Sequence, residues 1–523
     1  MPDQHALRNE TGFLQGLAMN SKVSGMFEEG LDPVIRQEMI APNLTREFPK
    51  VFPLITQINK AHVLMLADRE ILTPQQAAAL GAAILDMERD GVQAFDLDPS
   101  LEDPYFNYEA ELIRRAGPDI GGRVHIARSR NDLYATMDRL RARQAAFGLS
   151  GAVLDLRDAL IEKAREHADV LMPGYTHLQP AQPITYGYYL AGIAEALERD
   201  FARLAQCRQR INVSPLGAGA MAGTSFAIDR QATARWLGFD GVGLHAQDCI
   251  AARDFLVELL SAATLAATSW GRMAQDFFVM TTYEFGTLEL PDSVAQTSSM
   301  MPQKKNMSAL EVLRASSAQV LGAHVTAMTG LKATHYSFGF DSCCDPFRWT
   351  WDALDAASRG AAVARVVVSK ARPRPERMAD LTRENFSTAT DLADLLVRES
   401  GLSFRDAHHL VGAVVRAAAK NGMTADQISA EFIAEVAQTG FGQTVSLSEK
   451  SVAMASDPHQ AVQARRNSGG PSAHDMGGLL EKLEKAANLD RDGLAGETAS
   501  VKAAETALNR AFERLAGMAG ADA

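Results

Sequence analysis

The sequence predicts an all-α protein built around a bundle of long helices. Apolar residues recur at helical spacing through most of its 523 residues, whereas the alternating pattern of a half-buried strand is scarce. Several segments carry more than one apolar face, which predicts a bundle that buries its seams against partners. The long helical segments are Leu140–His167, Tyr188–Arg210, Ile250–Thr282, Ser308–Lys332 and Trp349–Ser369.

Shorter helical segments complete the prediction. Gln231–Trp236 forms one in the central part, and the Pro-Arg-Pro cluster near Arg372–Pro375 marks a boundary. Beyond an Asn-Ser-Gly-Gly-Pro-Ser break, the tail Leu479–Met518 is again helical and rich in Ala, Glu, Lys and Arg. Between the boundary and the break we expect three helices, Ala389–Glu399, Phe404–Lys420 and Thr424–Ala437.

The composition narrows the class of protein. A share of 46% apolar and 22% charged residues is typical of a globular chain. The net charge of −12 argues against a nucleic-acid or membrane partner, so an anionic substrate needs a local positive pocket. The four cysteines lack Cys-x-x-Cys spacing, Met1–Asn20 lacks a signal-peptide pattern, and no apolar window is long enough for a membrane span. We expect a cytoplasmic protein.

Five segments between the helices are dense in polar functional groups and read as loops. The richest is Asp292–Asn306, whose last part, Thr297–Asn306, combines two serines, two lysines and an asparagine directly before a helix. Lysine charge, free backbone N–H groups and the helix dipole together suit a small dianion. The alternative is an ordinary solvated loop. The other four predicted loops are Glu102–Tyr108, Arg123–Asp132, Met172–Pro183 and Ser214–Asp229.

These other loops carry complementary groups. Arg123–Asp132 supplies guanidinium forks, a hydroxyl and an amide that match a carboxylate, although a surface Arg/Asp network is the alternative. His177 has Thr176 and Gln179 as near neighbours, which favours a functional over a structural histidine. Ser214–Gly223 is glycine-rich without the dinucleotide-binding spacing, so we interpret it as a close-packing turn.

The sequence offers no motif for a metal, a cofactor or a serine hydrolase. His408-His409 is an isolated pair, and neither a His-Glu-x-x-His helix nor a Gly-x-Ser-x-Gly elbow occurs. We therefore expect no cofactor and no metal site.

Taken together, the loops resemble those of the aspartase/fumarase superfamily, and within it the argininosuccinate lyases. Ser298–Asn306 matches the superfamily signature Ser-Ser-x-Met-Pro-x-Lys-x-Asn in full. The resemblance runs from about Ser24 to the Ser-Gly-Gly-Pro break, which is roughly the whole chain. Motifs typical of the argininosuccinate-lyase branch are His125–Asp132, Pro173–Gln179, Ser214–Gly223 and Ala389–Asp394.

The resemblance implies a fold and an assembly. It predicts three mostly helical domains, 1–122, 123–371 and 372–523, of which the middle one is the long-helix bundle. It also implies a homotetramer in which each active site draws loops from three chains. The only other partner expected is a small anionic substrate.

The resemblance further implies a reversible β-elimination that releases fumarate. Ser298 is then the base, acting as an alkoxide whose pKa Lys304 and backbone N–H groups lower. His177 pairs with Glu311 and either orients or transfers a proton, a choice that stays open. The loop Asp292–Met301 closes over the substrate. The substrate-binding residues implied are Ser129, Arg130, Asn131, Thr176, Ser299, Asn306 and Tyr336, in addition to Lys304.

The sequence departs from the argininosuccinate-lyase pattern on the side of the leaving amine. Tyr105 stands where the family has histidine, Asp341 where it has glutamine, and Cys344 where it has lysine. Met39–Thr45 replaces the usual Phe-Asn-x-Ser-Ile run. Smaller departures are Ala127 for glycine and Met307 for proline.

We therefore predict cleavage of an N-substituted aspartate whose amine is not arginine, as in the ethylenediamine-disuccinate lyases. The alternatives are an authentic argininosuccinate lyase and a catalytically silent structural relative like the lens crystallins. Fumarate hydration and adenylosuccinate cleavage fit the branch-specific loops less well.

Overall fold

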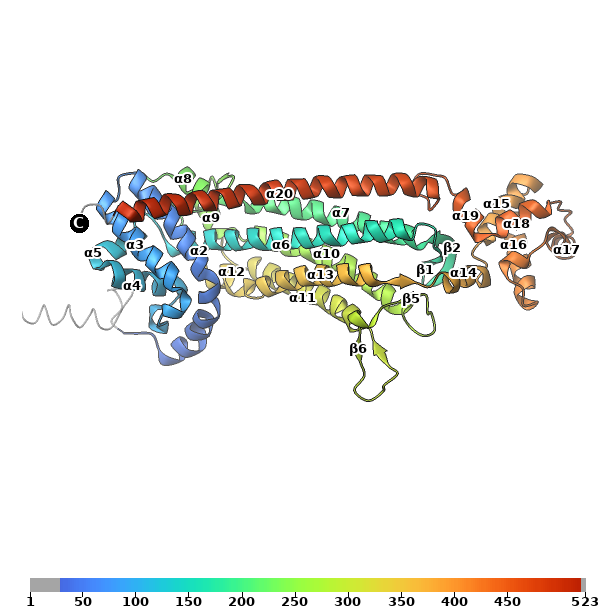
Figure 1. Cartoon of the computed structure of the whole chain (residues 1–523), viewed down its shortest axis with the longest axis horizontal. Helices are drawn as coiled ribbons and strands as arrows, with labels where there is room; N and C mark the ends of the chain where they lie inside the picture. The colour runs from blue at the N-terminus through green and yellow to red at the C-terminus, as the bar shows by residue number, and fades with distance from the viewer. Residues whose placement is uncertain (1–28, 519–523) are drawn as a thin grey trace, which may run out of the picture.

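The protein is an elongated all-α molecule, as predicted (Figure 1). The computed structural model describes residues 29–518, so the expectations for Met1–Asn20 and for the run that begins at Ser24 lie outside the described residues. Within this range no helix is long and apolar enough to cross a membrane. Five long helices pack around one apolar core: α6 (Arg130–Glu166), α7 (Tyr186–Ile211), α10 (Asp254–Met280), α11 (Ser308–Leu331) and α13 (Thr350–Lys370).

One predicted long helix is broken in two. The segment Ile250–Thr282 was expected to be continuous, but α9 (Ala246–Ala251) ends before α10 begins. Arg253 at the break has φ −132°, outside the helical range. Its guanidinium is fully buried and lies 3.0 Å from a carboxylate oxygen of Asp138 on α6. We attribute the break to this buried ion pair, because an uncompensated buried charge is costly.

The N-terminal unit packs at one end of the bundle around a second apolar core. The prediction that Glu102–Tyr108 is a loop is wrong, because α4 begins at Pro104. Asp103 caps this helix, since its Oδ1 accepts the Phe106 N–H at 2.9 Å. Proline at the first helical position costs no hydrogen bond. The helices of this unit are α2 (Ala41–Asp68), α3 (Pro74–Asp90), α4 (Pro104–Ala116), α5 (Pro118–Gly121) and α8 (Arg230–Trp236).

The C-terminal unit forms a third, smaller core at the opposite end. The predicted helix Thr424–Ala437 starts later than expected, because Ser429 caps α17 by accepting the Phe432 N–H at 3.0 Å. The helices here are α14 (Pro375–Glu384), α15 (Ala389–Ser400), α16 (Phe404–Lys420), α17 (Ala430–Phe441), α18 (Glu449–Ser456) and α19 (Pro458–Ala464).

The last helix, α20 (Ala473–Gly517), runs back along the whole bundle (Figure 1). Leu480 packs into the bundle core, whereas Phe512 packs into the N-terminal core. Between them, Asp490 pairs at 2.5 Å with the fully buried Arg157 of α6. We propose keeping the domain boundaries near residues 122 and 371 and treating α20 as a helix that joins the bundle core to the N-terminal core.

Short strands occur only as pairs in the described part of the chain. The prediction that Met172–Pro183 is a loop is wrong, because β1 and β2 form an antiparallel hairpin there. Its proline and glycine content hides the strand pattern. The pairs are β1 (Leu171–Thr176) with β2 (Gln179–Thr185), β3 (Val213–Ser214) with β4 (Gly241–Val242), β5 (Leu288–Glu289) with β8 (Arg372–Pro373), and β6 (Gln296–Thr297) with β7 (Lys305–Asn306).

Candidate active site

The predicted carboxylate-binding residues Ser129, Arg130 and Asn131 lie at the start of α6. The predicted loop Arg123–Asp132 ends earlier than expected, because Arg130 and Asn131 already belong to the helix. The Ser129 hydroxyl accepts the Asn131 N–H at 3.2 Å, and the Asp132 carboxylate accepts the Ser129 N–H at 2.9 Å. This capping box fixes the backbone that carries all three predicted carboxylate-binding residues.

Asp132 joins this helix start to the glycine-rich turn and was given no role by the sequence reasoning. It is fully buried, and its second oxygen accepts the N–H groups of Gly217 at 2.9 Å and Gly219 at 3.0 Å. Burial raises the pKa of the Asp132 carboxyl, against the opposing effect of these donors. The Ser-x-x-Asp spacing at residues 129–132 is the signal that identifies it.

The glycine-rich turn is a close-packing turn, as interpreted from the sequence. Gly219 has φ +61°, and a Cβ there would lie 2.6 Å from the Gly223 carbonyl oxygen. The neighbouring Ala220 carbonyl accepts the Asn131 Nδ2–H at 3.0 Å. The turn therefore orients the Asn131 amide at the end of the bundle.

Arg130 is already engaged within the chain. Its guanidinium lies 2.7 Å from Asp103 Oδ2 and 3.1 Å from Glu102 Oε2. It also lies 4.2 Å from the centre of the Phe106 ring. Both ion pairs use the same guanidinium nitrogen, and contact of the other nitrogens of Arg130 with a substrate carboxylate stays a prediction.

Tyr105, which replaces the family's histidine, is fully buried. Its hydroxyl donates to Glu109 Oε1 at 3.2 Å, lies 2.9 Å from His125 Nδ1, and accepts from Arg128 at 3.0 Å. Tyr105 therefore supports the buried Arg128 in this chain and is not itself exposed to a ligand. Arg128 is also buried and, like Asp132, was given no role from the sequence.

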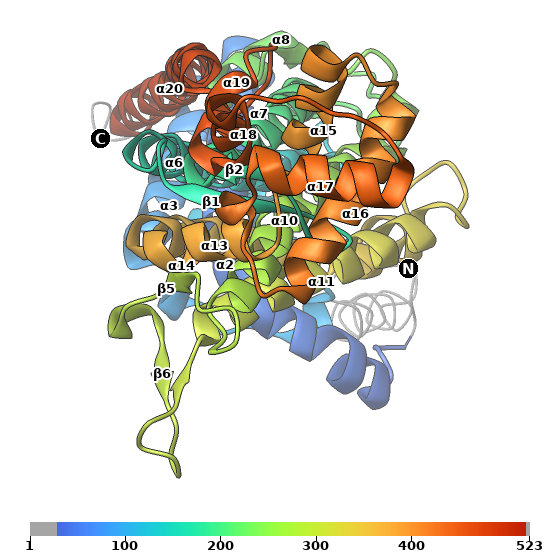
Figure 2. The same ribbon diagram turned by 90° about the vertical axis from the view of Figure 1, so that its right-hand side faces the viewer.

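The signature loop forms the tip of a hairpin that projects from the bundle (Figure 2). The Ser298 Oγ accepts the N–H groups of Met301 at 3.0 Å and Met300 at 3.4 Å. Hydrogen bonds to an oxygen that becomes an anion favour its deprotonated form. The geometry is therefore suited to an alkoxide at Ser298, whereas Ser299 is exposed without such donors within residues 29–518.

The two lysines of the loop differ in surroundings. The Lys305 ammonium donates to the Leu290 carbonyl at 2.6 Å and pairs with Asp292 at 2.8 Å, which anchors the base of the hairpin. Lys304 is exposed, and its ammonium has no partner in the part of the chain that the structure describes. Asn306 donates weakly to the Thr297 carbonyl at 3.5 Å. Lys304 is therefore the lysine available to a ligand.

His177 lies at the tip of the β1–β2 hairpin. Thr176 pairs with Gln179, so His177 and Leu178 form a two-residue loop with φ values of 54° and 55°. Such a turn needs two left-handed residues and normally has asparagine or glycine there. Leucine in this conformation is strained, and strained residues concentrate at functional sites.

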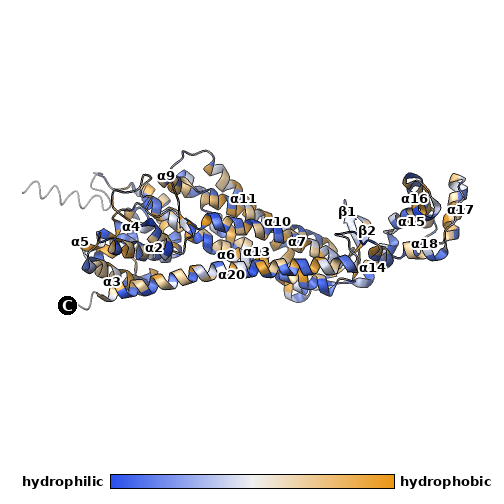
Figure 3. Cartoon of the chain, turned by 90° about the horizontal axis from the view of Figure 1, so that it is seen from above, coloured by the Kyte–Doolittle hydropathy of each residue, from blue (hydrophilic) through white to orange (hydrophobic). Residues whose placement is uncertain are grey.

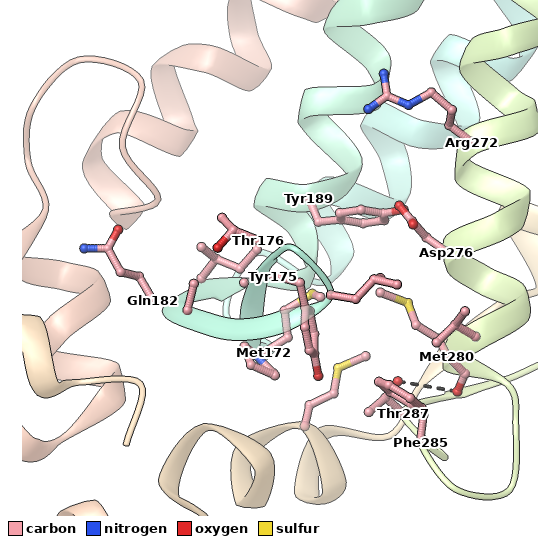
Figure 4. A pocket seen from close by; sticks show the side chains of 17 residues that line it. Met172, Tyr175, Thr176, Gln182, Tyr189, Arg272, Asp276, Met280, Phe285 and Thr287 are labelled. Carbon is pink, nitrogen blue, oxygen red and sulfur yellow. Dashed lines mark hydrogen bonds between the residues drawn. The ribbon is translucent and has the colours of Figure 1, made fainter. Parts of the chain in front are cut away.

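A cavity of about 500 Å³ lies behind this hairpin. Figure 4 shows Tyr175 and Thr176 of the hairpin on one side, and Tyr189 directed at Asp276 on the other. The Tyr189 hydroxyl donates to Asp276 at 2.8 Å. Neither the start of α6 nor the signature loop lines this cavity. Of the predicted site segments, only the one that forms the β1–β2 hairpin therefore lines this cavity.

The predicted site residues do not converge within one chain. Helix α6 has 37 residues, and its length is about 55 Å at 1.5 Å per residue. Asn131 begins this helix, whereas His177 lies in the hairpin beyond its end (Figure 1). No hydrogen bond or ion pair joins His177 to Glu311 among residues 29–518, and Glu311 is exposed on α11. Tyr336 donates a hydrogen bond to Asp248 of α9, which lies at the same end of the bundle as the start of α6.

Comparisons with known proteins agree over most of the chain. A lyase family model matches residues 43–322, and a model of the argininosuccinate lyase C-terminal region matches residues 386–463. Argininosuccinate lyase 1 of Shouchella clausii is 37% identical over 473 residues, which cover 90% of this chain and 95% of that protein. Argininosuccinate lyase of Methanothermobacter thermautotrophicus is 35% identical over 84% of this chain and 94% of its own length.

Solved structures show the same relationship. An EDDS lyase in complex with formate is 32% identical, with a TM-score of 0.85 over 94% of this chain and 97% of that chain. An EDDS lyase variant with bound fumarate matches equally well, at 32% identity and a TM-score of 0.85 over 96% and 98% of the two chains. A class II fumarase from Schistosoma mansoni, 17% identical with a TM-score of 0.64 over 78% and 89%, shares the fold. The chain therefore belongs to the argininosuccinate lyase family, and it is a carbon–nitrogen lyase that releases fumarate.

Proposed function

We propose that this lyase releases fumarate from an N-substituted aspartate whose amine is not arginine. The proposal rests on a contrast between the residues expected to act on the fumarate part of the substrate and those expected to contact its amine. The signature loop is complete, and its Ser298 hydroxyl accepts two backbone N–H groups. On the amine side, Asp341 and Cys344 replace the glutamine and lysine of the family.

In this proposal Ser298 removes the Cβ proton of the aspartate. The carbanion that forms is an aci-carboxylate, whose charge Lys304 and Asn306 stabilise together with Asn131. His177, with Glu311, orients the substrate or supplies a proton as the C–N bond breaks. The amine then leaves, and fumarate remains. Ser129 and Thr176 bind the carboxylates as hydrogen-bond donors.

We propose that the active site forms only in a homotetramer. The separation of about 55 Å between Asn131 and His177 supports this, because no substrate of this class spans it. The surface of α11 supports it as well, since it carries four apolar side chains that are about half exposed in the single chain. These side chains are Val312, Leu321, Val325 and Met328. Figure 3 shows orange, hydrophobic stretches along the ribbon of α11.

Argininosuccinate itself is the second candidate substrate. The curated relatives are argininosuccinate lyases, whereas the structural neighbours at 32% identity include EDDS lyase. A site built to bind the polar groups of arginine loses much of its preference when their partners are replaced. The changes at Asp341 and Cys344 therefore favour another amine.

Fumarate release, followed by ultraviolet absorbance, tests the proposal with argininosuccinate, ethylenediamine disuccinate and further N-substituted aspartates. We expect turnover of at least one compound other than argininosuccinate. Ser298→Ala should lower kcat by about 10²–10⁴-fold, while Ser293→Ala, an exposed serine before the same hairpin, should leave it unchanged. Efficient turnover of argininosuccinate alone contradicts the proposal.

The same assay separates an enzyme from a silent structural relative. A wild type that releases no fumarate from any compound, and a Ser298→Ala variant indistinguishable from it, would establish the silent relative. We also propose a cytoplasmic location, which fractionation of expressing cells would check.

A further inference from the structure

A second cavity, of about 200 Å³, adjoins the start of α6. Arg130 and Asn131 line it, so it lies beside the residues assigned to a substrate carboxylate. The remaining walls come from α2, the start of α4, the body of α6, the segment around α12 (Phe340–Cys343) and the start of α13. Unlike the larger cavity behind the β1–β2 hairpin, it is formed next to the proposed reaction centre.

Three of the runs in which the sequence departs from the argininosuccinate-lyase pattern reach this cavity, although Tyr105 and Asp341 themselves do not line it. Asn43 belongs to the changed N-terminal run, Pro104 to the changed run at the start of α4, and Cys344 to the changed run after α11. The runs are far apart in the chain, yet all three reach the same walls. Changes that meet at one cavity indicate a change in what occupies it.

Aromatic rings form much of the wall. Tyr134, Phe338, Phe340 and Trp351 line it, and the rings of Phe338 and Phe340 meet edge to face with centroids 6.2 Å apart. Phe340 is 61% exposed. Rings placed in this way offer apolar faces and edges to another flat group.

The charged groups of the wall are largely neutralised by one another. Glu47 accepts hydrogen bonds from Arg46 at 2.9 Å and from Arg141 at 3.0 Å. Burial raises the pKa of the Cys344 thiol to about 12, so this position is uncharged where the family has lysine. Arg348 lines the cavity with an exposed side chain, where water screens its charge. The cavity therefore favours an apolar group over a second carboxylate.

We propose that this cavity holds an aromatic ring on the leaving amine, which makes the substrates N-(arylalkyl)aspartates. The proposal rests on the proposed function and specifies its amine. A cavity of about 150 Å³ is known to hold benzene, so the volume here accommodates one ring with part of its linker.

The first test compares fumarate release from N-(2-phenylethyl)aspartate, N-methylaspartate, ethylenediamine disuccinate and argininosuccinate by the full-length enzyme. We expect kcat/KM for the phenylethyl compound to exceed each of the others by at least about tenfold, as the fit of a ring predicts. A preference for ethylenediamine disuccinate or N-methylaspartate overturns the aromatic assignment alone. Absence of turnover with all four overturns the proposed function as well.

The second test uses two exposed aromatic residues as a matched pair. Phe340 lines the cavity, whereas Trp349, 54% exposed, does not. In Phe340→Ala, the ratio of kcat/KM for the phenylethyl compound to that for N-methylaspartate should fall about tenfold. In Trp349→Ala the ratio should stay the same. An equal ratio in both variants, or loss of the tetramer in Phe340→Ala with the ratio unchanged, overturns the assignment.

Discussion

Mixed oligomers of two inactive variants give the sharpest test of the shared active site. Asn131→Ala removes an amide at the start of α6, and His177→Asn removes the imidazole at the hairpin tip. Because α6 places these positions about 55 Å apart in one chain, a site that uses both must take them from different copies. Each variant alone should therefore be inactive, while a mixed oligomer contains some sites with two intact contributions.

The expected recovery follows from random assembly. With equal amounts of the two chains, each contribution to a site is intact with a probability of one half, so about a quarter of the sites recover. The assay is fumarate release by co-expressed chains that carry different affinity tags and are purified through both. The recovered sites should have the wild-type KM, since their residues are unchanged.

A matched control distinguishes shared sites from a general effect of mixing. Ser129→Ala and Asn131→Ala lie in the same capping box and reach a site from the same chain, so their mixed oligomer should recover no activity. Absence of recovery with the Asn131 and His177 pair would refute the reasoning. Equal recovery in the control would refute it too.

Three further predictions concern stability. Asp132→Ala should lower the free energy of unfolding by about 3 kcal/mol or more, because it leaves two buried N–H groups and one partly buried N–H group unpaired; urea unfolding measures this, and a loss below about 1 kcal/mol contradicts it. Leu178→Asn should raise stability by about 0.5–1 kcal/mol, because asparagine tolerates φ +55° better; an unchanged or lower melting temperature argues against strain. Burial, with the nearby Arg128 charge, holds the pKa of His62 well below its usual 6.5, so the unfolded chain binds a proton there that the folded chain does not. Stability from this group is present above about pH 6.5 and falls by about 1.4 kcal/mol per pH unit below it; His62→Gln should flatten this slope between pH 7.5 and 5.5, whereas His408→Gln on the surface should not.

The sequence predicted the class of fold because helix periodicity is a local property. The segment Phe404–Lys420 is predicted at both ends, since its caps and apolar stripe are contained in the residues themselves. The start of α6 was placed too late, although the capping-box spacing at Ser129 and Asp132 marks it. Apolar periodicity alone places the start of this helix at Leu140, because the first turns of α6 carry many polar residues.

Other features depend on partners that are distant in the sequence. The break before α10 has no glycine or proline to mark it, and it follows from the buried pairing of Arg253 with Asp138. The strands β1 and β2 contain Pro173, Pro180 and Pro183, and only their pairing identifies them. Likewise, the full burial of Tyr105 changes its role from a ligand contact to a support of Arg128.

The signature loop is followed directly in the chain by α11, the helix whose exposed apolar side chains support a contact with another copy. The hairpin that presents Ser298 leads directly into α11, whose exposed face carries Val325 and Met328. A projecting loop whose Lys304 ammonium has no partner among residues 29–518 gains nothing for a single chain, and an apolar helix face exposed to water is unfavourable. Both become favourable if α11 packs against another copy, because the apolar face is then buried and the projecting loop can reach a second chain. Catalysis and association would then depend on the same helix, which accounts for the separate positions of the proposed site residues within a single chain.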